Sequence, residues 1–310
     1  MGKNIKQEPK EEGKKPVSGE EFVRLAHNYY TSLGITSNYQ KIAEDFQFSQ
    51  YLAEHIGDIE KKYKVAFVWI CLNQPYWQYA MQMMEGAKQF FLPSHHTDYF
   101  VWSDMPQEMI PGVTVFETEP VQWPFPTLMR YHLFLQQEEK LREYDYIFYC
   151  DVDMKFVQVV GDEILGEGLT AAHHPMYEVR DSVKFPLEPN PNSSAYIPQP
   201  AHYYAGGFQG GKADLFIEAM RVMKKRIDKD FNINYTARWN DESHWNKYLF
   251  ENPPSVILDS SYVYPDSLIE EYYKPIVWGK NLQPRLITLT KPFSTSKEGG
   301  EAVRKLINPQ

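Results

Sequence analysis

Apolar residues gather in short continuous runs along the middle of the chain. Residues 64–71 (KVAFVWIC) and 146–150 (YIFYC) contain almost no polar side chain. Such runs are typical of strands that are buried on both faces, as in parallel sheets. Shorter runs at 98–104, 112–116 and 286–289 predict further strands. The pattern therefore predicts a buried sheet that begins near residue 64.

Segments with helical spacing of apolar residues separate these strands. Residues 76–91, 126–143 and 212–230 have this spacing, and each lies between two apolar runs or follows one. Alternating strands and helices predict an α/β fold with a doubly wound unit and right-handed crossovers. The first half of such a unit most often binds a nucleotide, although neither GxGxxG nor a P-loop occurs here.

The first 62 residues differ from the rest. Residues 1–17 are rich in lysine and glutamate and nearly devoid of apolar side chains, so we predict a disordered tail. Residues 18–62 show apolar residues at helical spacing and predict a helical extension. The main domain is predicted to cover residues 63–310.

Composition narrows the class of protein. The 310 residues are 43% hydrophobic and 15% aromatic, which predicts a globular protein with a substantial core. A net charge of −9 argues against a nucleic-acid partner. Cys71 and Cys150 lie inside apolar runs and are predicted to be buried free thiols, which fits a reducing compartment. No apolar run approaches the ~18 residues of a membrane span, so we expect a soluble, cytoplasmic protein.

Two carboxylates follow the second apolar run. Asp151 and Asp153 fall at or just past the C-terminal end of the strand at 146–150, where open α/β sheets bind ligands. Two hard oxygen donors suit a divalent cation that keeps open positions for a phosphorylated substrate. Taken alone, such a pair is more often a solvated acidic turn.

A glycine-rich stretch follows in a region, residues 174–211, whose many Pro, Gly, Asn and aromatic residues predict a substrate-binding loop. Residues 203–211 read YYAGGFQGG, with four glycines in six residues. Glycine allows a ligand to approach the backbone closely. A β-bulge or tight turn explains the same residues without a ligand.

An acidic pair opens a later helix. Asn240 or Asp241 is a natural N-cap, which places Glu242 in the first turn, where the helix dipole favours an ionised carboxylate. Acids in first turns are common for stability alone. Trp239 and Trp245 nearby bring aromatic faces beside carboxylates, as in carbohydrate sites.

Together these motifs resemble glycosyltransferase family 6, in the order of that family, from about Val65 to Arg304. The motifs are Asp151-Val152-Asp153-Met154, His174-Pro175, Ala195-Tyr196-Ile197-Pro198, Tyr203 to Gly211, and Trp239-Asn240-Asp241-Glu242-Ser243-His244 followed by Asn246-Lys247-Tyr248. The resemblance implies a GT-A fold, with a Rossmann-like nucleotide-binding half, a mixed sheet and an acceptor-binding half. It places the donor-nucleotide half at about 63–156, the acceptor half at about 157–284 and a basic closing segment at 285–310.

The resemblance also implies a reaction. It predicts retaining transfer of a sugar from a UDP-sugar to the 3-OH of a galactoside or fucosylated galactoside, in α-1,3 linkage. Asp151 and Asp153 would hold Mn²⁺ against the UDP diphosphate. Glu242 would act at the anomeric carbon as nucleophile or as stabiliser of an oxocarbenium-like transition state. Asp241 would bind donor-sugar hydroxyls.

The remaining candidates fall into three groups. His174 and Trp239 would contact the acceptor. Arg130 would reach the donor sugar or Asp151, and Tyr76 would lie near the uracil. The basic candidates for closure over the diphosphate are Lys291 and Arg304.

Donor choice is predicted from Ala205, Gly206 and Gly207. In the family, the first and third of these positions discriminate N-acetylgalactosamine from galactose donors, and small residues make room for the N-acetyl group. UDP-GalNAc is therefore expected over UDP-Gal, although one methyl group discriminates by only ~1–3 kcal/mol.

Two other classes of function remain open at this stage. A metal-dependent nucleotide-sugar phosphohydrolase would use Asp151 and Asp153 with a water, but needs more ligands than these. A non-catalytic carbohydrate-binding protein explains the aromatic residues but not Glu242 beside an acidic strand end.

Overall fold

The computed structural model of the chain describes residues 63–105, 110–175, 187–199, 201–266 and 282–289. The predicted tail at 1–17 and the helical extension at 18–62 lie outside these residues. So do Lys291 and Arg304 of the predicted closing segment.

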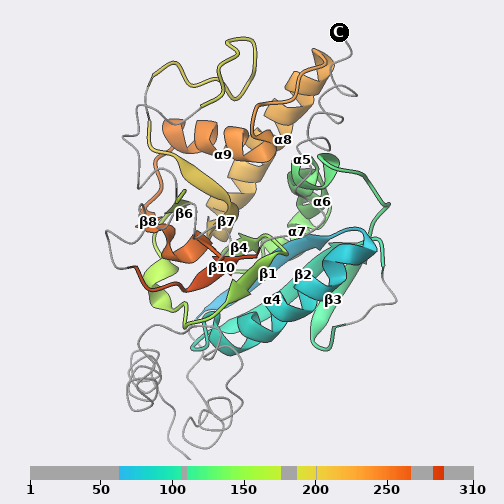
Figure 1. The fold of residues 1–310 in the computed structure, drawn as a ribbon, viewed down its shortest axis with the longest axis vertical. Helices are drawn as coiled ribbons and strands as arrows, with labels where there is room; N and C mark the ends of the chain where they lie inside the picture. The colour runs from blue at the N-terminus through green and yellow to red at the C-terminus, as the bar shows by residue number, and fades with distance from the viewer. Residues whose placement is uncertain (1–62, 106–109, 176–186, 200, 267–281, 290–310) are drawn as a thin grey trace, which may run out of the picture.

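A large mixed sheet forms the centre of the molecule (Figure 1). Within the described ranges it has seven strands in the order β3-β2-β1-β4-β7-β6-β8. The pairs β1–β2, β2–β3, β1–β4 and β6–β8 are parallel, whereas β7 is antiparallel to both β4 and β6. The strands are β1 (Lys64–Cys71), β2 (His96–Ser103), β3 (Val113–Glu117), β4 (Tyr146–Cys150), β6 (Leu169–His173), β7 (Tyr204–Lys212) and β8 (Val256–Leu258).

A small second sheet lies beside the first, in the order β5-β10-β9. Its strands are β5 (Met154–Phe156), β9 (Tyr264–Pro265) and β10 (Leu286–Thr288). The helices are α4 (Trp77–Phe90), α5 (Phe125–Leu128), α6 (Arg130–Leu135), α7 (Glu138–Leu141), α8 (Ala213–Asn232) and α9 (Asn240–Glu251). Short 3-10 helices are η1 (Gln74–Tyr76), η2 (Asp162–Ile164) and η4 (Ser260–Val263).

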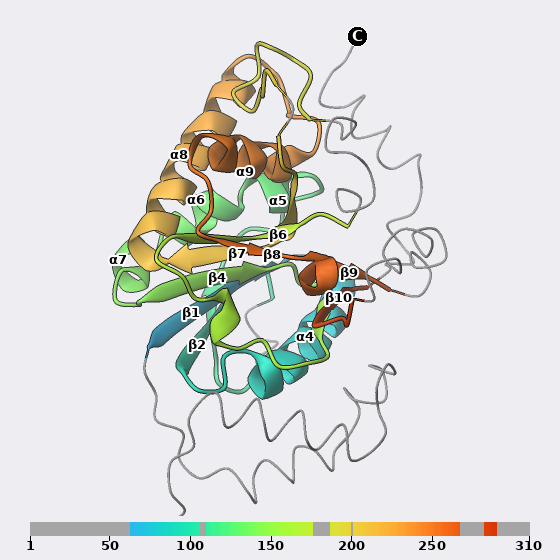
Figure 2. The ribbon, with the colours of Figure 1, turned by 90° about the vertical axis from the view of Figure 1, so that its left-hand side faces the viewer.

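Helices cover both faces of the sheet, and β1 shows why its sequence is apolar throughout. Successive side chains of a strand point to opposite faces. Phe67 and Trp69 pack in the core under α4, while Val68 and Ile70 pack in a second core under α6, α8 and α9. Figure 2 shows α4 on one side of the sheet and α6, α8 and α9 on the other. This mixed α/β architecture fits the GT-A fold that the sequence predicted.

The prediction of one continuous helix at 126–143 is wrong. The structure has three short helices there, α5, α6 and α7. The breaks fall at Met129 and at Gln137, whose φ of −113° and ψ of 27° leave the helical region. Helical spacing of apolar residues persists across such breaks, so the pattern alone does not reveal them.

The glycine-rich segment is a sheet strand and not part of a loop. Residues 204–212 form β7, which pairs with β4 from Cys150↔Phe208 to Tyr146↔Lys212. On its other side, the pairing with β6 shifts register between Ala171 and His173. The glycine-rich segment therefore contains a register shift of the kind that a β-bulge gives. The shift lies within a strand at the centre of the main sheet.

Both cysteines are free and buried, as predicted. Burial, reinforced by Asp104, raises the pKa of the Cys71 thiol to about 12. Burial likewise raises the pKa of Cys150 well above its ordinary value. In the part of the chain that the structure describes, no helix combines the length and the apolar character needed to cross a bilayer.

Glycine at position 210 is required by packing. A Cβ there would lie 2.3 Å from Cδ1 of Phe148 and 2.5 Å from the carbonyl oxygen of Ile147. We expect Gly210→Ala to lower the free energy of unfolding by about 1–3 kcal/mol or more, because β4 and β7 must move apart. Urea denaturation followed by circular dichroism measures the change.

Gly207→Ala on the same strand is the matched control. Its Cβ would meet the ends of the Asp151 and Met154 side chains at 3.1 and 3.3 Å, so a shift of a few tenths of an ångström would relieve the contact. We expect a smaller loss than at Gly210. Equal losses in the two variants would contradict this account of the β4–β7 contact.

Candidate active site

The two carboxylates lie where the sequence predicted, just beyond the C-terminal end of β4. The backbone N–H of Asp151 donates to the carbonyl oxygen of Gly207 at 2.8 Å, which fixes the end of β4 against β7. The Asp151 side chain is 35% exposed, whereas Asp153 is only 6% exposed. Oδ1 of Asp151 accepts hydrogen bonds from Tyr149 and Arg130.

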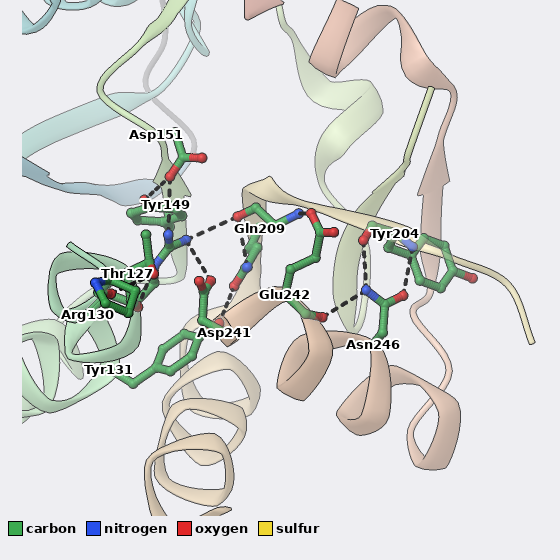
Figure 3. Close-up of polar contacts among 12 residues, drawn as sticks. Thr127, Arg130, Tyr131, Tyr149, Asp151, Tyr204, Gln209, Asp241, Glu242 and Asn246 are labelled. Carbon is green, nitrogen blue, oxygen red and sulfur yellow. Dashed lines mark hydrogen bonds and ion pairs between the residues drawn. The ribbon is translucent and has the colours of Figure 1, made fainter. Parts of the chain in front are cut away.

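Arg130, at the start of α6, connects the two acidic motifs (Figure 3). Its guanidinium forms ion pairs with Asp151 at 3.3 Å and with Asp241 at 3.1 Å. It also donates to the carbonyl oxygen of Gly206 at 3.1 Å and stacks over the ring of Tyr149. Burial lowers the pKa of Arg130, but the surrounding carboxylates, Asp241 foremost, more than offset it and raise the pKa above its ordinary value.

Glu242 lies in the first turn of α9, as predicted, although Trp239 and not Asn240 or Asp241 is the N-cap. Both of its carboxylate oxygens accept hydrogen bonds: Oε1 from the Tyr203 hydroxyl at 2.6 Å and Oε2 from the backbone N–H of Gly206 at 2.7 Å. A Cβ on Gly206 would lie 3.0 Å from Cβ of Glu242. Glycine at 206 thus allows α9 to approach β7 closely.

One turn further along α9, Asn246 attaches the helix to β7. Its amide nitrogen donates to the carbonyl oxygen of Tyr204 at 2.8 Å, and its oxygen accepts from the Tyr204 N–H at 2.8 Å. The same amide nitrogen also donates to the carbonyl oxygen of Glu242. A side chain therefore satisfies strand hydrogen bonds where β6 shifts register, and it fixes the turn that carries Glu242.

Two adjoining cavities share Asp151 in their walls. The first, of about 140 Å³, lies at the ends of β1 and β4, and the second, of about 220 Å³, lies beside β7 and α9. The first is lined by Ile70, Leu72, Asn73, Tyr76, Trp123, Pro126, Thr127, Arg130, Tyr149, Asp151, Val152 and Asp153. The second is lined by Asp151, Met154, His174, Pro175, Ala205, Gly207, Glu242, Val263, Pro265 and Thr288.

Most of the predicted site residues in the described ranges thus lie on one connected surface, with three exceptions. Gly206 lines neither cavity, although its backbone is hydrogen-bonded to Arg130 and Glu242. Asp241 is buried beneath it against Arg130, and lines neither cavity. Trp239 is 38% exposed at the start of α9 and also lines neither cavity. Its ring instead lies under the guanidinium of Arg238.

Burial shifts the protonation of the acidic pair. It raises the pKa of Asp241 to about 7, although Arg130 opposes the shift. Burial also raises the pKa of Glu242 to about 7, against the hydrogen bonds from Tyr203 and Gly206, which favour the ionised form. Burial lowers the pKa of His174 to about 4, so its imidazole is neutral at pH 7.

The carboxylates at the end of β4 fit a divalent cation that a substrate helps to coordinate. Oδ1 of Asp151 is engaged by protein, whereas Oδ2 faces the space that the missing side chain of Gly207 leaves. Within the described ranges, no cluster of three or more His, Cys, Asp or Glu side chains forms a closed metal site. This donor set matches an open site for Mn²⁺ or Mg²⁺ with oxygen ligands.

Three residues with contacts to the site were not assigned a role from sequence. Tyr149 lies two residues before Asp151, so alternation along β4 was the available signal. Asn246 lies four residues after Glu242 on the same helix face. Tyr203 had no comparable signal, because its contact with Glu242 spans 39 residues.

Glu242→Gln is expected to stabilise the protein at high pH. A carboxyl whose pKa is raised from 4.5 to about 7 in the folded state stabilises that state below pH 4.5, and this contribution is lost as the pH rises through about 7. Glutamine carries no such cost and keeps the shape of the side chain. Because Glu242 is only partly buried, at the wall of the second cavity, we expect the variant to gain about 1–2 kcal/mol relative to wild type at pH 8 and not the full value of the pKa shift.

Thermal unfolding at pH 5 and pH 8 measures this difference, with Glu251→Gln at the other end of α9 as control. Glu251 is stabilised as an anion by Arg226 and Lys247, so its replacement should have the opposite sign. An equal effect of Glu242→Gln at both pH values would contradict a raised pKa for Glu242 in the folded protein.

Comparisons with known proteins agree with this geometry. The family model of glycosyltransferase family 6 matches residues 59–276. The chain is 31% identical over 204 residues to a human globoside alpha-1,3-N-acetylgalactosaminyltransferase 1, covering 62% of this chain and 58% of that protein. It is 32% identical over 199 residues to the rat histo-blood group ABO system transferase 1, covering 60% and 57%.

A bacterial protein is similar over most of its own length. The chain is 27% identical over 204 residues to the O-antigen biosynthesis glycosyltransferase WbnI of Escherichia coli, covering 64% of this chain and 86% of that protein. The match to the animal relatives spans less than three fifths of their length. The predicted resemblance is confirmed: the chain belongs to glycosyltransferase family 6.

Proposed function

We propose that this protein is a retaining glycosyltransferase that moves N-acetylgalactosamine, or galactose, from a UDP-sugar to the 3-OH of a galactoside in α-1,3 linkage. The observation that supports this best is the pair of cavities that meet at Asp151. One has an arginine and two carboxylates suited to a diphosphate and its cation, and the other has Glu242 and His174. The human relative is named as an α-1,3-N-acetylgalactosaminyltransferase.

The nucleotide would occupy the cavity at the ends of β1 and β4. Its walls combine apolar residues and aromatic rings, among them Tyr76 and Trp123, with the carboxylates at its far end. A uracil ring would lie against Tyr76, and the diphosphate would then point toward Asp151 and Asp153. A position at the C-terminal ends of parallel strands is the usual one for a nucleotide in α/β folds.

Asp151 and Asp153 would hold Mn²⁺, with further oxygen ligands supplied by the diphosphate. When bound, the cation would neutralise the charge that develops on the departing UDP. Arg130 adds a fixed positive charge on the same side and orients Asp151 through its ion pair. Lys291 and Arg304 remain the candidates for closing over the diphosphate.

Glu242 would act from the floor of the second cavity. Its carboxylate is held by two hydrogen bonds and cannot rotate freely. At the anomeric carbon it would either attack as a nucleophile or stabilise the positive charge of an oxocarbenium-like transition state. Both roles require the ionised form, so activity should fall as the pH drops below about 7.

The small residues of β7 support N-acetylgalactosamine as the favoured donor sugar. Ala205 and Gly207 line the cavity that contains Glu242, and the missing side chain at 207 leaves room next to Asp151. The acceptor, a galactoside or fucosylated galactoside, would enter beside His174, whose neutral imidazole can exchange hydrogen bonds with hydroxyl groups. A role for Trp239 in acceptor binding and for Asp241 in binding donor hydroxyls remains a prediction.

The two alternative functions are less well supported. A hydrolase using a cation and water at Asp151 and Asp153 would want a third His, Cys, Asp or Glu ligand, and the described residues contain no such group of three. A binding protein would not need a carboxylate held by two hydrogen bonds at a cavity wall, because ionising it in a buried position costs stability.

Incubation with UDP-GalNAc or UDP-Gal, a galactoside with or without fucose, and Mn²⁺ or chelator tests the proposal. We expect acceptor-dependent release of UDP, faster with UDP-GalNAc. Release of inorganic phosphate, or UDP release that ignores the acceptor, would rule out the transferase function.

Asp153→Asn should weaken the response to the cation. At limiting Mn²⁺ we expect turnover to fall at least about tenfold, which corresponds to about 1.4 kcal/mol of lost interaction. Calorimetry of UDP binding with and without Mn²⁺ reports the same loss without catalysis. Asp214→Asn, at an exposed aspartate of α8, is the control. Wild-type turnover that persists in chelator would remove the metal from the mechanism.

Glu242→Gln should lower turnover by about 10²–10³-fold with little change in UDP affinity, because an electrostatic partner of the transition state is lost. Initial rates at saturating donor, combined with UDP calorimetry, separate the two effects. Turnover close to that of wild type would exclude Glu242 from the chemical step.

A further inference from the structure

Tyr203 has a buried phenol that points at the acidic residue of the site. It directly precedes β7, and only 1% of its surface is exposed. Its hydroxyl donates to Oε1 of Glu242 at 2.6 Å, a short distance typical of a hydrogen bond to an ionised carboxylate. Tyr203 lines neither cavity, so its hydroxyl acts on the site through Glu242.

Two donors on opposite oxygens fix the plane of the Glu242 carboxylate. Tyr203 bonds Oε1, and the N–H of Gly206 bonds Oε2 at 2.7 Å. The Gly206 donor is part of the backbone of β7 and cannot be varied by a side chain. The Tyr203 hydroxyl is therefore the one of these two donors that a substitution can remove.

The ring of Tyr203 is itself held in place. The His174 ring meets it edge-on, with centroids 5.8 Å apart and planes at 76°. The backbone N–H of His174 also donates to the carbonyl oxygen of Tyr203 at 3.1 Å. The same histidine lines the cavity with Glu242, so Tyr203 joins the acceptor side of the cavity to the carboxylate.

The charges around Glu242 explain why a second donor matters. Asp241 precedes it on α9, and Asp151 faces the same cavity from the end of β4. Arg130 of α6 is already shared between these two aspartates. Burial and Asp151 both disfavour a negative Glu242, and the hydrogen bonds from Tyr203 and Gly206 are what oppose them most strongly.

We propose that Tyr203 is a positioning residue whose hydroxyl fixes the orientation and the ionised form of Glu242 for sugar transfer. This inference rests on the proposed function of Glu242. The phenol donates its proton toward the carboxylate and stays protonated, since burial and the adjacent Glu242 raise the pKa of Tyr203 well above its ordinary value. Tyr203 touches neither substrate, and its effect is transmitted by one hydrogen bond.

Tyr203→Phe removes that hydrogen bond and keeps the ring. We expect kcat to fall about ten- to hundredfold, because a misplaced catalytic group costs on this scale. The affinity for UDP with Mn²⁺, measured by calorimetry, should be unchanged, and the acid limb of the pH profile of kcat should move to higher pH. A loss of stability alone would not move that limb.

Tyr144→Phe is the matched control. Tyr144 also donates a phenolic hydrogen bond to a carboxylate, Asp98, at 2.7 Å, but it precedes β4, at the opposite end of that strand from Asp151. Its pH profile should match that of wild type. An unchanged kcat and pH profile in Tyr203→Phe, or an equal change in Tyr144→Phe, would overturn the proposal.

A readout without turnover separates this proposal from the proposed function. The Glu242 carboxyl carbon can be followed by carbon-13 NMR across pH, with Glu242→Gln to assign its signal. A higher titration midpoint of Glu242 in Tyr203→Phe than in wild type supports the proposed role of the Tyr203 hydroxyl, and equal midpoints overturn it. This holds even if wild type transfers no sugar from either UDP-sugar, an outcome that would reject the proposed function alone.

Discussion

The site depends on the backbone N–H and C=O of Gly206. Its N–H donates to Glu242, and its carbonyl oxygen accepts from Arg130 and from the side chain of Gln209. Gln209 in turn accepts a hydrogen bond from Tyr131 of α6. Because a side chain at 206 would press on Cβ of Glu242, glycine is what lets these groups converge. The backbone of one residue thus joins the helix that carries Glu242 to the helix that carries Arg130.

The sheet topology brings the acidic motifs together from distant parts of the chain. β7 runs antiparallel to β4, so its first residues lie near the C-terminal end of β4, which Asp151 directly follows. The last residue of β4, Cys150, lies opposite Phe208, so residues 204–206 at the start of β7 extend beyond the end of β4. Asn246 and Glu242 of α9 take up the backbone groups there. Backbone groups of β7 that would otherwise be buried without partners are thus the place where α9 attaches.

Strong local patterns made much of the fold predictable. The apolar runs gave β1 and β4 and placed Asp151 beyond a strand end, and helix capping placed Glu242 in a first turn. The sequence predicts a loop where β7 lies, because glycines carry no alternation of apolar side chains and their close contacts depend on the neighbouring strand. The spacing of apolar residues does not predict the breaks near Met129 and Gln137, because it is the same on both sides of a short interruption of the helix.

Contacts made through space were the part that sequence left open. Arg130 was predicted to reach Asp151 or the donor sugar, but its ion pair with Asp241 joins residues that no local pattern connects. Tyr203 and Asn246 lay inside recognised motifs without a role, since their partners come from other elements. Trp239 is the opposite example. It belongs to the motif that contains Glu242 and was predicted to bind the acceptor, yet it lines neither cavity.

The central claim is that the two cavities meeting at Asp151 hold one reaction, transfer with retention onto an acceptor hydroxyl. Proton NMR of the product formed from UDP-GalNAc, a galactoside and Mn²⁺ tests it most directly. The account predicts a new α-configured N-acetylgalactosamine whose anomeric proton correlates with C3 of the acceptor galactose. A β-configured product, or free N-acetylgalactosamine with no acceptor modified, would contradict it.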